Sequence, residues 1–317
     1  MSVPNGFNPT FKGIVTAAGF NGPNVNDTVG NVYYVIQKSK AFYNTFIASH
    51  QMTYQDGSVA VYGDDGDGLG IQAAINACKG GRNDYVLVGT GNYNLTVALT
   101  TSGKSSVHLI GVNGVGCEVG TVGASALTQT GAYENVIMEA YGELAGFQII
   151  NKAGYSAVTM ANGKWRANIH NNWFHMVQGT ACNIIETAGS GMSYGTIANN
   201  RFQTYVGGAI SSAIYLAGPT ACQISGNWIN NSSGTMDTAI NLYAGVQNLI
   251  IDNMISDCTG AGTITNGVTL GAGASGFTAV GNRFVMPTGS AFSGGTANRT
   301  FCQNFDAQAG GETAIES

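Results

Sequence analysis

From about residue 105 onward, short apolar runs alternate with Gly, Asn and Ser, and one pattern recurs: an apolar residue, two further residues, an Asn, one residue and another apolar residue. The copies are IHNNWF (169–174), IANNRF (197–202), ISGNWI (224–229), IIDNMI (250–255), AVGNRF (279–284) and the shorter FCQNF (301–305). The shared residues are Asn172, Asn200, Asn227, Asn253, Asn282 and Asn304, which are 28, 27, 26, 29 and 22 positions apart. This spacing predicts one structural unit repeated along the chain.

A second set of alternating apolar and polar positions lies between these copies. Its members are SAVTM (156–160), SAIYL (212–216), TAINL (238–242) and NGVTL (266–270). Two strand signals that share one period predict one coil of a solenoid per repeat. The same rhythm extends back to LAGFQI (144–149), with Gly146 in the Asn position, and to LIGVNG (109–114).

These patterns predict an all-β fold, a right-handed single-stranded parallel β-helix of about seven or eight coils. Successive coils would lie about 4.8 Å apart, so equivalent residues would stack on one another. The stacked Asn side chains would bond to one another at a corner and adopt the left-handed backbone conformation there, with Gly at neighbouring corners. A leucine-rich horseshoe needs more Leu per repeat and a propeller blade needs about 40–45 residues, so neither fits.

Residues 1 to about 100 have a mixed α/β pattern instead. Strands are predicted at 31–36, 58–62 and 84–89, and helices at 40–50 and 71–78. Ser39 is the expected N-cap of the first helix. The predicted organisation is an N-terminal α/β anchoring segment (1–62), a capping helix and start of the β-helix (63–104), the β-helix (105–305) and a C-terminal tail (306–317).

Composition narrows the classes of function. Charged residues are only 9% of the chain, while 44% of residues are hydrophobic and the mean hydropathy is +0.07, which favours a folded protein with a substantial core. With 12 Lys and Arg residues and a formal net charge of −5, the chain lacks the basic face that nucleic-acid binding needs. The six Cys residues stand singly, which predicts neither a metal site nor a disulfide framework.

The sequence also predicts no membrane segment and no secretory leader. No run reaches about 18 apolar residues. The first ten residues, MSVPNGFNPT, lack the basic start and apolar core of a signal peptide. We therefore expect a protein made in the cytoplasm, with no membrane partner.

One segment carries a family resemblance. Residues 63–94 (GDDGDGLGIQAAINACKGGRNDYVLVGTGNYN) combine a Gly/Asp-rich turn, an IQ-A-A-I helix, an apolar strand and a G-x-Y turn, and resemble the start of pectate-lyase-like β-helix proteins. Thr90 stands where those proteins usually have Pro. Residues 32–62 are similar to the start of β-helix proteins of tailed bacteriophages, where the protein is attached to the virion. This resemblance implies a virion protein of the capsid decoration or head fibre type.

The sequence contains few candidate catalytic or metal-binding side chains. A polysaccharide lyase or glycoside hydrolase needs several carboxylates, but residues 144–305 contain only Glu186, Asp237, Asp252 and Asp257. Asp252 and Asp257 are the one pair that could share a side of a coil, and solvated surface acids are the alternative. Asp64, Asp65 and Asp67 are interpreted as a turn into the capping helix, since the EF-hand spacing is absent. No metal or cofactor is expected.

Aromatic residues suggest a binding surface. Trp165, Trp173 and Trp228 could line a sugar-binding face, although the Asn-x-aromatic pattern favours the core for Trp173 and Trp228. Tyr215 and Tyr243 are one repeat apart in the sequence and are predicted to stack on adjacent coils, as a candidate stripe for binding or subunit contact.

Two functional hypotheses follow. The first is a non-catalytic structural virion protein, a homotrimer in contact with capsid or other virion proteins and able to bind host-surface or environmental glycans. The alternative is a tail-associated polysaccharide depolymerase, a lyase or glycoside hydrolase, on the same fold.

Overall fold

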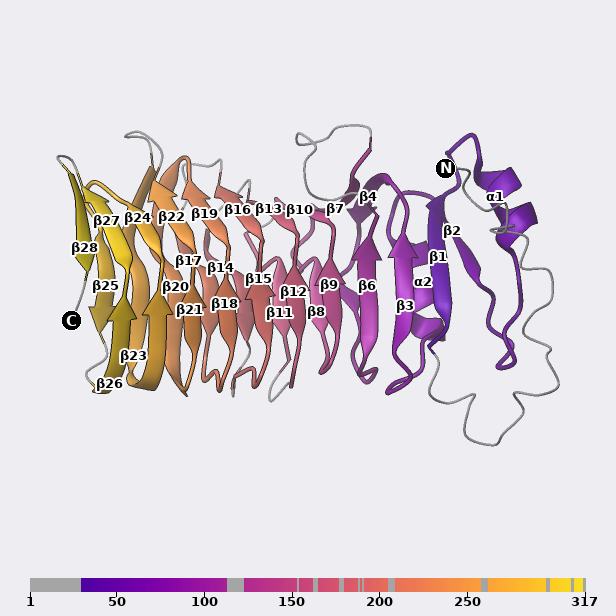
Figure 1. Cartoon of the computed structure of the whole chain (residues 1–317). Helices are drawn as coiled ribbons and strands as arrows, with labels where there is room; N and C mark the ends of the chain where they lie inside the picture. Colours follow the sequence, from indigo (N-terminus) through magenta and orange to yellow (C-terminus); the bar gives the residue numbers. More distant parts are fainter. Residues whose placement is uncertain are drawn as a thin grey trace, which may run out of the picture.

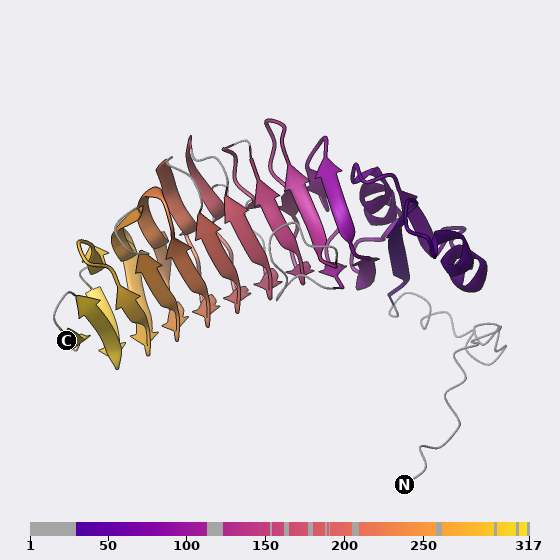
Figure 2. The same cartoon turned by 90° about the horizontal axis from the view of Figure 1, so that it is seen from above.

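A computed structural model describes residues 30–112, 123–152, 154–161, 165–176, 180–187, 189, 191–204, 209–257, 262–294, 297–308 and 311–315. Within these residues the chain winds into a parallel β-solenoid of about nine turns, with two short helices near its N-terminal end (Figure 1). Viewed from above, the stack of coils is arched (Figure 2). The predicted right-handed parallel β-helix is therefore confirmed.

Each coil contributes up to three strands, which form two sheets of 18 and 10 strands among the described residues. The larger sheet contains a first and a second series of strands. The first series comprises β5 (Leu99–Thr100), β8 (Val136–Met138), β11 (Val158–Met160), β14 (Thr180–Thr187), β17 (Ala209–Leu216), β20 (Gly234–Val246), β23 (Gly262–Val280) and β25 (Ser290–Gly294).

The second series begins with β2 (Val61–Asp64), which pairs with β1 (Val32–Gln37), and runs in parallel register toward the C-terminal end. Its further members are β3 (Asp84–Val88), β6 (Val107–Gly111), β9 (Glu143–Ala145), β12 (Asn168–His170), β15 (Thr196–Ala198), β18 (Gln223–Ser225), β21 (Leu249–Ile251), the last part of β23, and β26 (Ala297–Cys302).

The smaller sheet forms the third series, one strand per coil. It comprises β4 (Gly91–Leu95), β7 (Ser125–Gln129), β10 (Gln148–Asn151), β13 (Trp173–Met176), β16 (Arg201–Thr204), β19 (Trp228–Asn231), β22 (Met254–Asp257), β24 (Arg283–Val285), β27 (Asn304–Gln308) and β28 (Gly311–Ile315). All neighbours pair in parallel except β27 and β28, which are antiparallel. The predicted C-terminal tail thus contains a strand that covers the end of this sheet.

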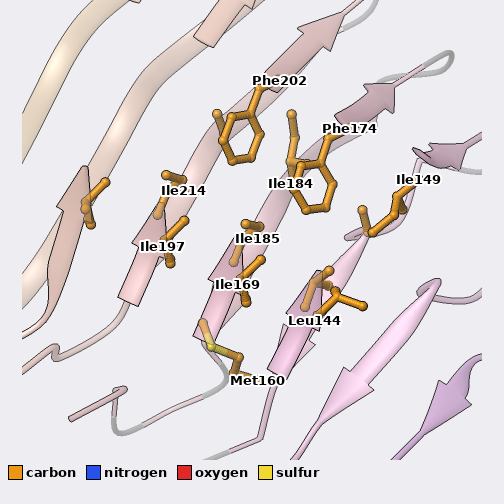
Figure 3. Packing of buried hydrophobic residues seen from close by; sticks show 14 of the residues in the cluster. Leu144, Ile149, Met160, Ile169, Phe174, Ile184, Ile185, Ile197, Phe202 and Ile214 are labelled. Atoms are coloured by element: carbon orange, nitrogen blue, oxygen red, sulfur yellow. The ribbon is translucent and has the colours of Figure 1, made fainter. Parts of the chain in front are cut away.

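The core consists of apolar columns inside the coil. In the second series Leu144, Ile169 and Ile197 lie in register and are fully buried. In the third series Phe174 stacks on Phe202, with ring centroids 4.9 Å apart. Figure 3 shows these columns pointing toward one another across the interior. Similar residues form columns because each coil places its equivalent side chain one strand spacing from that of the preceding coil.

A second column, of amides, occupies the corner between the second and third series. The six Asn residues predicted as a ladder, Asn172 to Asn304, are all at most 2% exposed. The Oδ1 of each later member accepts hydrogen bonds from the backbone N–H and the Nδ2 of the member before it, at 2.9–3.2 Å. The predicted Asn ladder is therefore present.

The backbone at this corner corrects one detail of the prediction. The left-handed conformation belongs to the residue before each ladder Asn, not to the ladder Asn itself. Asn171, Asn199, Gly226, Asp252, Gly281 and Gln303 all have φ between 52° and 68°. Gly146, with φ of 73°, belongs to the same set, so Phe147 and not Gly146 occupies the ladder position of its coil. The Phe147 backbone N–H donates to Asn172 Oδ1 at 3.1 Å, which ends the ladder there.

The N-terminal elements differ in detail from the prediction. Helix α1 (Tyr43–His50) starts three residues late, without Ser39 as its cap, and buries no residue. The second predicted strand is shifted from 58–62 to β2. Helix α2 (Leu69–Ala77) matches the predicted capping helix and buries Ile71, Ala74 and Ile75 against the first coils.

The larger sheet runs without a break across the predicted boundary at residue 104, because β3 and β6 pair in parallel over five positions. The solenoid therefore begins at β2 and β1, earlier than the predicted residue 105. The division into domains itself stays a prediction, and residues 1–29 of the anchoring segment lie outside the described residues.

Candidate functional site

A cluster of three ionisable side chains lies on the outer face of the second series. His108 on β6, Glu143 on β9 and His170 on β12 come from successive coils. Glu143 Oε2 lies 2.7 Å from His108 Nδ1, and Glu143 Oε1 lies 2.6 Å from His170 Nε2. The three side chains are 17–23% exposed, so solvent reaches the cluster. One carboxylate thus links two imidazoles across three coils.

Electrostatics favour the ionised carboxylate in this cluster. The hydrogen bond from His108 lowers the pKa of Glu143, and the bond from His170 adds to this effect against the opposing effect of burial. Both carboxylate oxygens are occupied, so Glu143 orients the two imidazoles and is not a free nucleophile. No three His, Cys, Asp or Glu side chains in the described part of the chain are arranged to hold a metal ion.

One exposed aromatic ring contacts this cluster, and three others lie at the turns before β9, β12 and β15. Tyr85 stacks on His108 with ring centroids 4.3 Å apart. Tyr141, Trp165 and Tyr194, which we call the aromatic corner, are 46%, 49% and 52% exposed. The backbone N–H of Tyr141 donates to the carbonyl of Trp165, and the Trp165 and Tyr194 rings lie 5.6 Å apart. The corner therefore presents rings on successive coils, next to a polar cluster.

A left-handed backbone conformation explains why the aromatic corner exposes its rings to solvent. Tyr141 and Tyr194 have φ of 57° and 56°, a conformation that turns the chain sharply before β9 and β15. Bulky residues are uncommon at such positions, because the side chain crowds the following carbonyl. Aromatic side chains together with a few polar groups are the usual lining of small-molecule and sugar sites. This arrangement suits a saccharide that lies along the corner.

The third series carries a different outward column. Its strands alternate, so that Phe174 and Phe202 point inward while Trp173, Arg201 and Trp228 point outward in register. The Arg201 guanidinium carbon lies 4.6 Å from the centroid of Trp173 and 4.2 Å from that of Trp228. The prediction that Trp173 and Trp228 belong to the core is therefore wrong: Trp173 is buried but outside the continuous apolar cluster, and Trp228 is only half-buried.

The predicted acidic pair is not brought together. Asp252 is the left-handed corner residue before β22, whereas Asp257 is the last residue of that strand. An extended strand rises about 3.3 Å per residue, so the strand keeps the two carboxylates at opposite ends of one side of the coil. Asp257 is 6% exposed and its Oδ2 accepts the backbone N–H of Ile264, while burial raises its pKa. This placement suits a structural acceptor.

The tyrosine pair is close but not stacked in register. Tyr215 pairs with Asn241, not with Tyr243, so the predicted vertical stacking is wrong by two positions. Tyr243 is 62% exposed and Tyr215 is half-buried. Burial raises the pKa of Tyr215, with contributions from Tyr243 and Glu186. A binding role for the pair stays a prediction.

The Gly/Asp-rich loop is organised by one side chain. Asp64 is 1% exposed; its Oδ1 accepts backbone N–H groups from residues 66, 67 and 68, and its Oδ2 accepts those from residues 70 and 71. These bonds satisfy the free N–H groups at the start of α2. The interpretation of the loop as a turn into the capping helix is confirmed.

Sequence inspection missed the His108–Glu143–His170 cluster. Glu143 lies one position before the repeats of residues 144–305, so it was not among the predicted candidate acids. The available signal was the period itself, because Glu143 and His170 are separated by one repeat of the solenoid. The Trp173–Arg201–Trp228 column shows the same period, with one repeat between each member and the next.

Comparisons with known proteins do not assign the chain to a family. No known protein family and no curated protein matches the sequence. Among solved structures the chain is similar to "Geobacillus virus E2 - ORF18", at 12% sequence identity and a TM-score of 0.32, over 89% of this chain and 75% of that one. A likeness of this size carries no argument about function, and the fold is established by the strand pairings of this chain. No helix in the described part of the chain is long and apolar enough to cross a membrane.

Proposed function

We propose that this protein is a non-catalytic structural component of a tailed-bacteriophage virion, a capsid decoration or head fibre protein. It acts as a stiff rod that contacts host-surface or environmental glycans through the aromatic corner. The observation that carries this proposal is the Asn ladder, because its buried amides hold six successive coils together and perform no chemistry at the surface.

The attachment to a phage rests on the resemblance of residues 32–62 to virion β-helix proteins of tailed bacteriophages. On this proposal the N-terminal elements face the particle and the solenoid projects from it. A homotrimer fits the low charge of the chain, since 9% charged residues leave faces that neighbouring copies can cover.

The glycan contact rests on the aromatic corner and its polar neighbours. Trp165 and Tyr194 offer exposed rings on successive coils, and one coil advances by about 4.8 Å, close to the length of one sugar unit. The partly exposed His108 imidazole, which Glu143 orients, supplies a hydrogen-bonding group for a hydroxyl.

The alternative function, a tail-associated polysaccharide depolymerase, has one observation in its favour. Glu143 is a partly exposed carboxylate with two imidazoles within hydrogen-bonding distance. A glycosidase, however, uses two carboxyl groups about 5–9.5 Å apart. No second carboxylate in the described part of the chain is bonded into this cluster.

Two measurements test the proposal. Mass spectrometry of purified particles should detect the protein in many copies per virion, and its absence from particles would overturn the structural role. Purified protein incubated with host capsule should release no reducing ends or unsaturated products. If products form and Glu143→Gln abolishes them, while the exposed Asp237→Asn does not, the depolymerase alternative replaces the proposal.

A further inference from the structure

The Trp173–Arg201–Trp228 column contains a positive charge that has no ion-pair partner among the described residues, in a chain with only 9% charged residues. Its guanidinium is stacked between two indole rings from the coils before and after it. Such a sandwich fixes the plane of the guanidinium and leaves only its edge to make further contacts. The arrangement therefore presents a pre-oriented cation on the outer face of the third series.

Three buried polar atoms of this column lack hydrogen-bond partners. Trp173 Nε1, Trp228 Nε1 and Arg201 Nε are buried without a hydrogen-bond partner. Within the described residues, no carboxylate or other acceptor contacts the Arg201 side chain. Trp173 is 7% exposed, so its indole N–H is a buried donor without a partner beside the Arg201 cation. Buried donors without acceptors are costly, and sites that recognise a ligand commonly carry them.

The neighbouring outward column is neutral. Gln203 lies next to Arg201 on β16, and Asn230 and Ser256 follow on the next two coils in register. Gln203 Oε1 is itself buried and unpartnered. The outward positions of β13, β16 and β19 hold no Asp or Glu, so no acidic side chain on these strands competes for Arg201.

His175, also on this face, does not add a second charge near neutral pH. It packs against Trp173 with ring centroids 4.2 Å apart and is fully buried. Burial, together with the nearby Arg201 cation, lowers its pKa to about 4. Among the outward positions of β13, β16 and β19, the positive charge is therefore concentrated at Arg201, and the next cation of its column is the exposed Arg283 on β24.

We propose that this face binds the carboxylate of an acidic saccharide, with the half-buried Arg201 as its counter-ion and the half-buried Gln203 amide facing a sugar hydroxyl. A saccharide fits better than an acidic peptide, because a single fixed cation beside a neutral amide matches one carboxylate with hydroxyls around it. The site is separate from the aromatic corner and does not depend on a virion role.

Fluorine NMR of protein labelled with 5-fluorotryptophan tests the site directly, because the chain has only three Trp residues. Trp173 and Trp228 report on this face, and the exposed Trp165 reports on the aromatic corner. Signals are assigned with single Trp→Phe variants. The probes are a glucuronate-containing oligosaccharide, a neutral glucose oligosaccharide of equal length, and triglutamate.

We expect the glucuronate probe to shift the Trp173 and Trp228 signals, and the other two probes to leave them unchanged. A shift of Trp165 alone would support the aromatic corner and overturn this site. Equal shifts with triglutamate would overturn the choice of a saccharide. Equal shifts with the neutral oligosaccharide would overturn the role of the carboxylate.

Variants separate binding from a purely structural stack. Arg201→Gln should weaken glucuronate binding at least about tenfold, and Arg201→Lys should weaken it less, because it keeps the charge but loses the planar stack. Arg283→Gln, on the same outward column two strands beyond Trp228, is the matched control and should leave binding within about twofold. Thermal unfolding is measured for each variant. If Arg201→Gln lowers only the melting temperature and a folded Arg201→Lys protein binds as wild type, the stack is structural and the proposal fails.

Discussion

Asn227 accepts two hydrogen bonds from Asn200, the preceding member of the ladder. Its Oδ1 accepts the backbone N–H of Asn200 at 3.0 Å and the Nδ2 of Asn200 at 3.1 Å. Its own Nδ2 donates to the carbonyl of Ile197 at 2.9 Å, in the same coil as Asn200. A single buried side chain therefore bonds a backbone donor and a backbone acceptor of the preceding coil. This relationship repeats along the corner and makes the ladder a chain of linked bonds.

Replacing Asn227 with Ala should destabilise the protein markedly. The change removes the acceptor of the buried Asn200 N–H, and an unsatisfied buried donor costs about 1–3 kcal/mol. With the other lost bonds, we expect the free energy of unfolding to fall by about 2–4 kcal/mol, measured by chemical denaturation. Asn241→Ala, on the outer face one coil away, is the control and should change it by less than about 0.5 kcal/mol. Equal effects of the two changes would contradict the ladder.

Asp252 tests the left-handed corner. Its φ of 52° suits Asn and Gly but not a β-branched residue. Asp252→Asn should therefore leave stability unchanged, whereas Asp252→Val should cost about 1–2 kcal/mol. Denaturation of the two variants side by side checks this. A stable Asp252→Val protein would show that the corner does not impose this conformation.

His175 should make the protein sensitive to mild acid. Its pKa is lowered to about 4 in the folded state, so between about pH 6.5 and pH 4 the unfolded chain binds a proton that the folded chain does not. The stability is complete above pH 6.5 and falls by up to about 3 kcal/mol on going to pH 4. His175→Gln should flatten this slope in pH-dependent unfolding, and His50→Gln, at an exposed site, should not. Parallel curves for wild type and His175→Gln would refute the assignment.

Glu143 should affect the pH dependence of stability in a more acidic range than His175. Because His108 and His170 lower its pKa from 4.5, its stabilisation is complete above that value and is lost as the pH falls through the folded-state pKa. At pH 7 we expect Glu143→Gln to lose about 1–2 kcal/mol of stability, and the two unfolding curves to converge in acid. Asp237→Asn, an exposed change of the same kind, is the control. A difference that persists at pH 2 would exclude the ionic origin.

Asp64 should control the folding of the capping helix. Removing it in Asp64→Ala leaves several buried N–H groups of residues 66–71 without their acceptor, and we expect a loss of at least about 3 kcal/mol. Hydrogen exchange of α2 should become faster in the same variant. Asp65→Ala is the control, since Asp65 is exposed and its side chain is bonded, within the described residues, only to Lys38. Unchanged exchange in α2 would show that Asp64 does not hold the turn.

The sequence predicted the ladder correctly but placed the strained backbone one residue too late. The reason is the doublets Asn171–Asn172 and Asn199–Asn200, in which either Asn could take either role. The other coils distinguish the two positions: Gly226, Asp252 and Gly281 precede their ladder Asn, and Gly is the residue most tolerant of a positive φ. The coils taken together therefore assign the left-handed conformation to the residue before each ladder Asn.

The candidate sites were harder to predict than the fold. A ladder repeats one residue type at one spacing, so a single sequence reveals it. The His108–Glu143–His170 cluster instead combines different residue types from three coils. Their contact depends on the register of β6, β9 and β12, and the unequal sequence spacings between the three residues do not fix that register without knowledge of the loop lengths.

By itself the sequence determined the solenoid, its period and its amide corner. Hydrophobic alternation and an Asn at a fixed position are local sequence patterns, and they recur in each coil. The tertiary structure alone decided which faces are outward and what meets on them. It turned Trp173 and Trp228 away from the core and onto Arg201, and it separated Asp252 from Asp257 along one strand. A change of one position in a strand moves a side chain from the interior to the surface, and only the pairing of coils fixes that position.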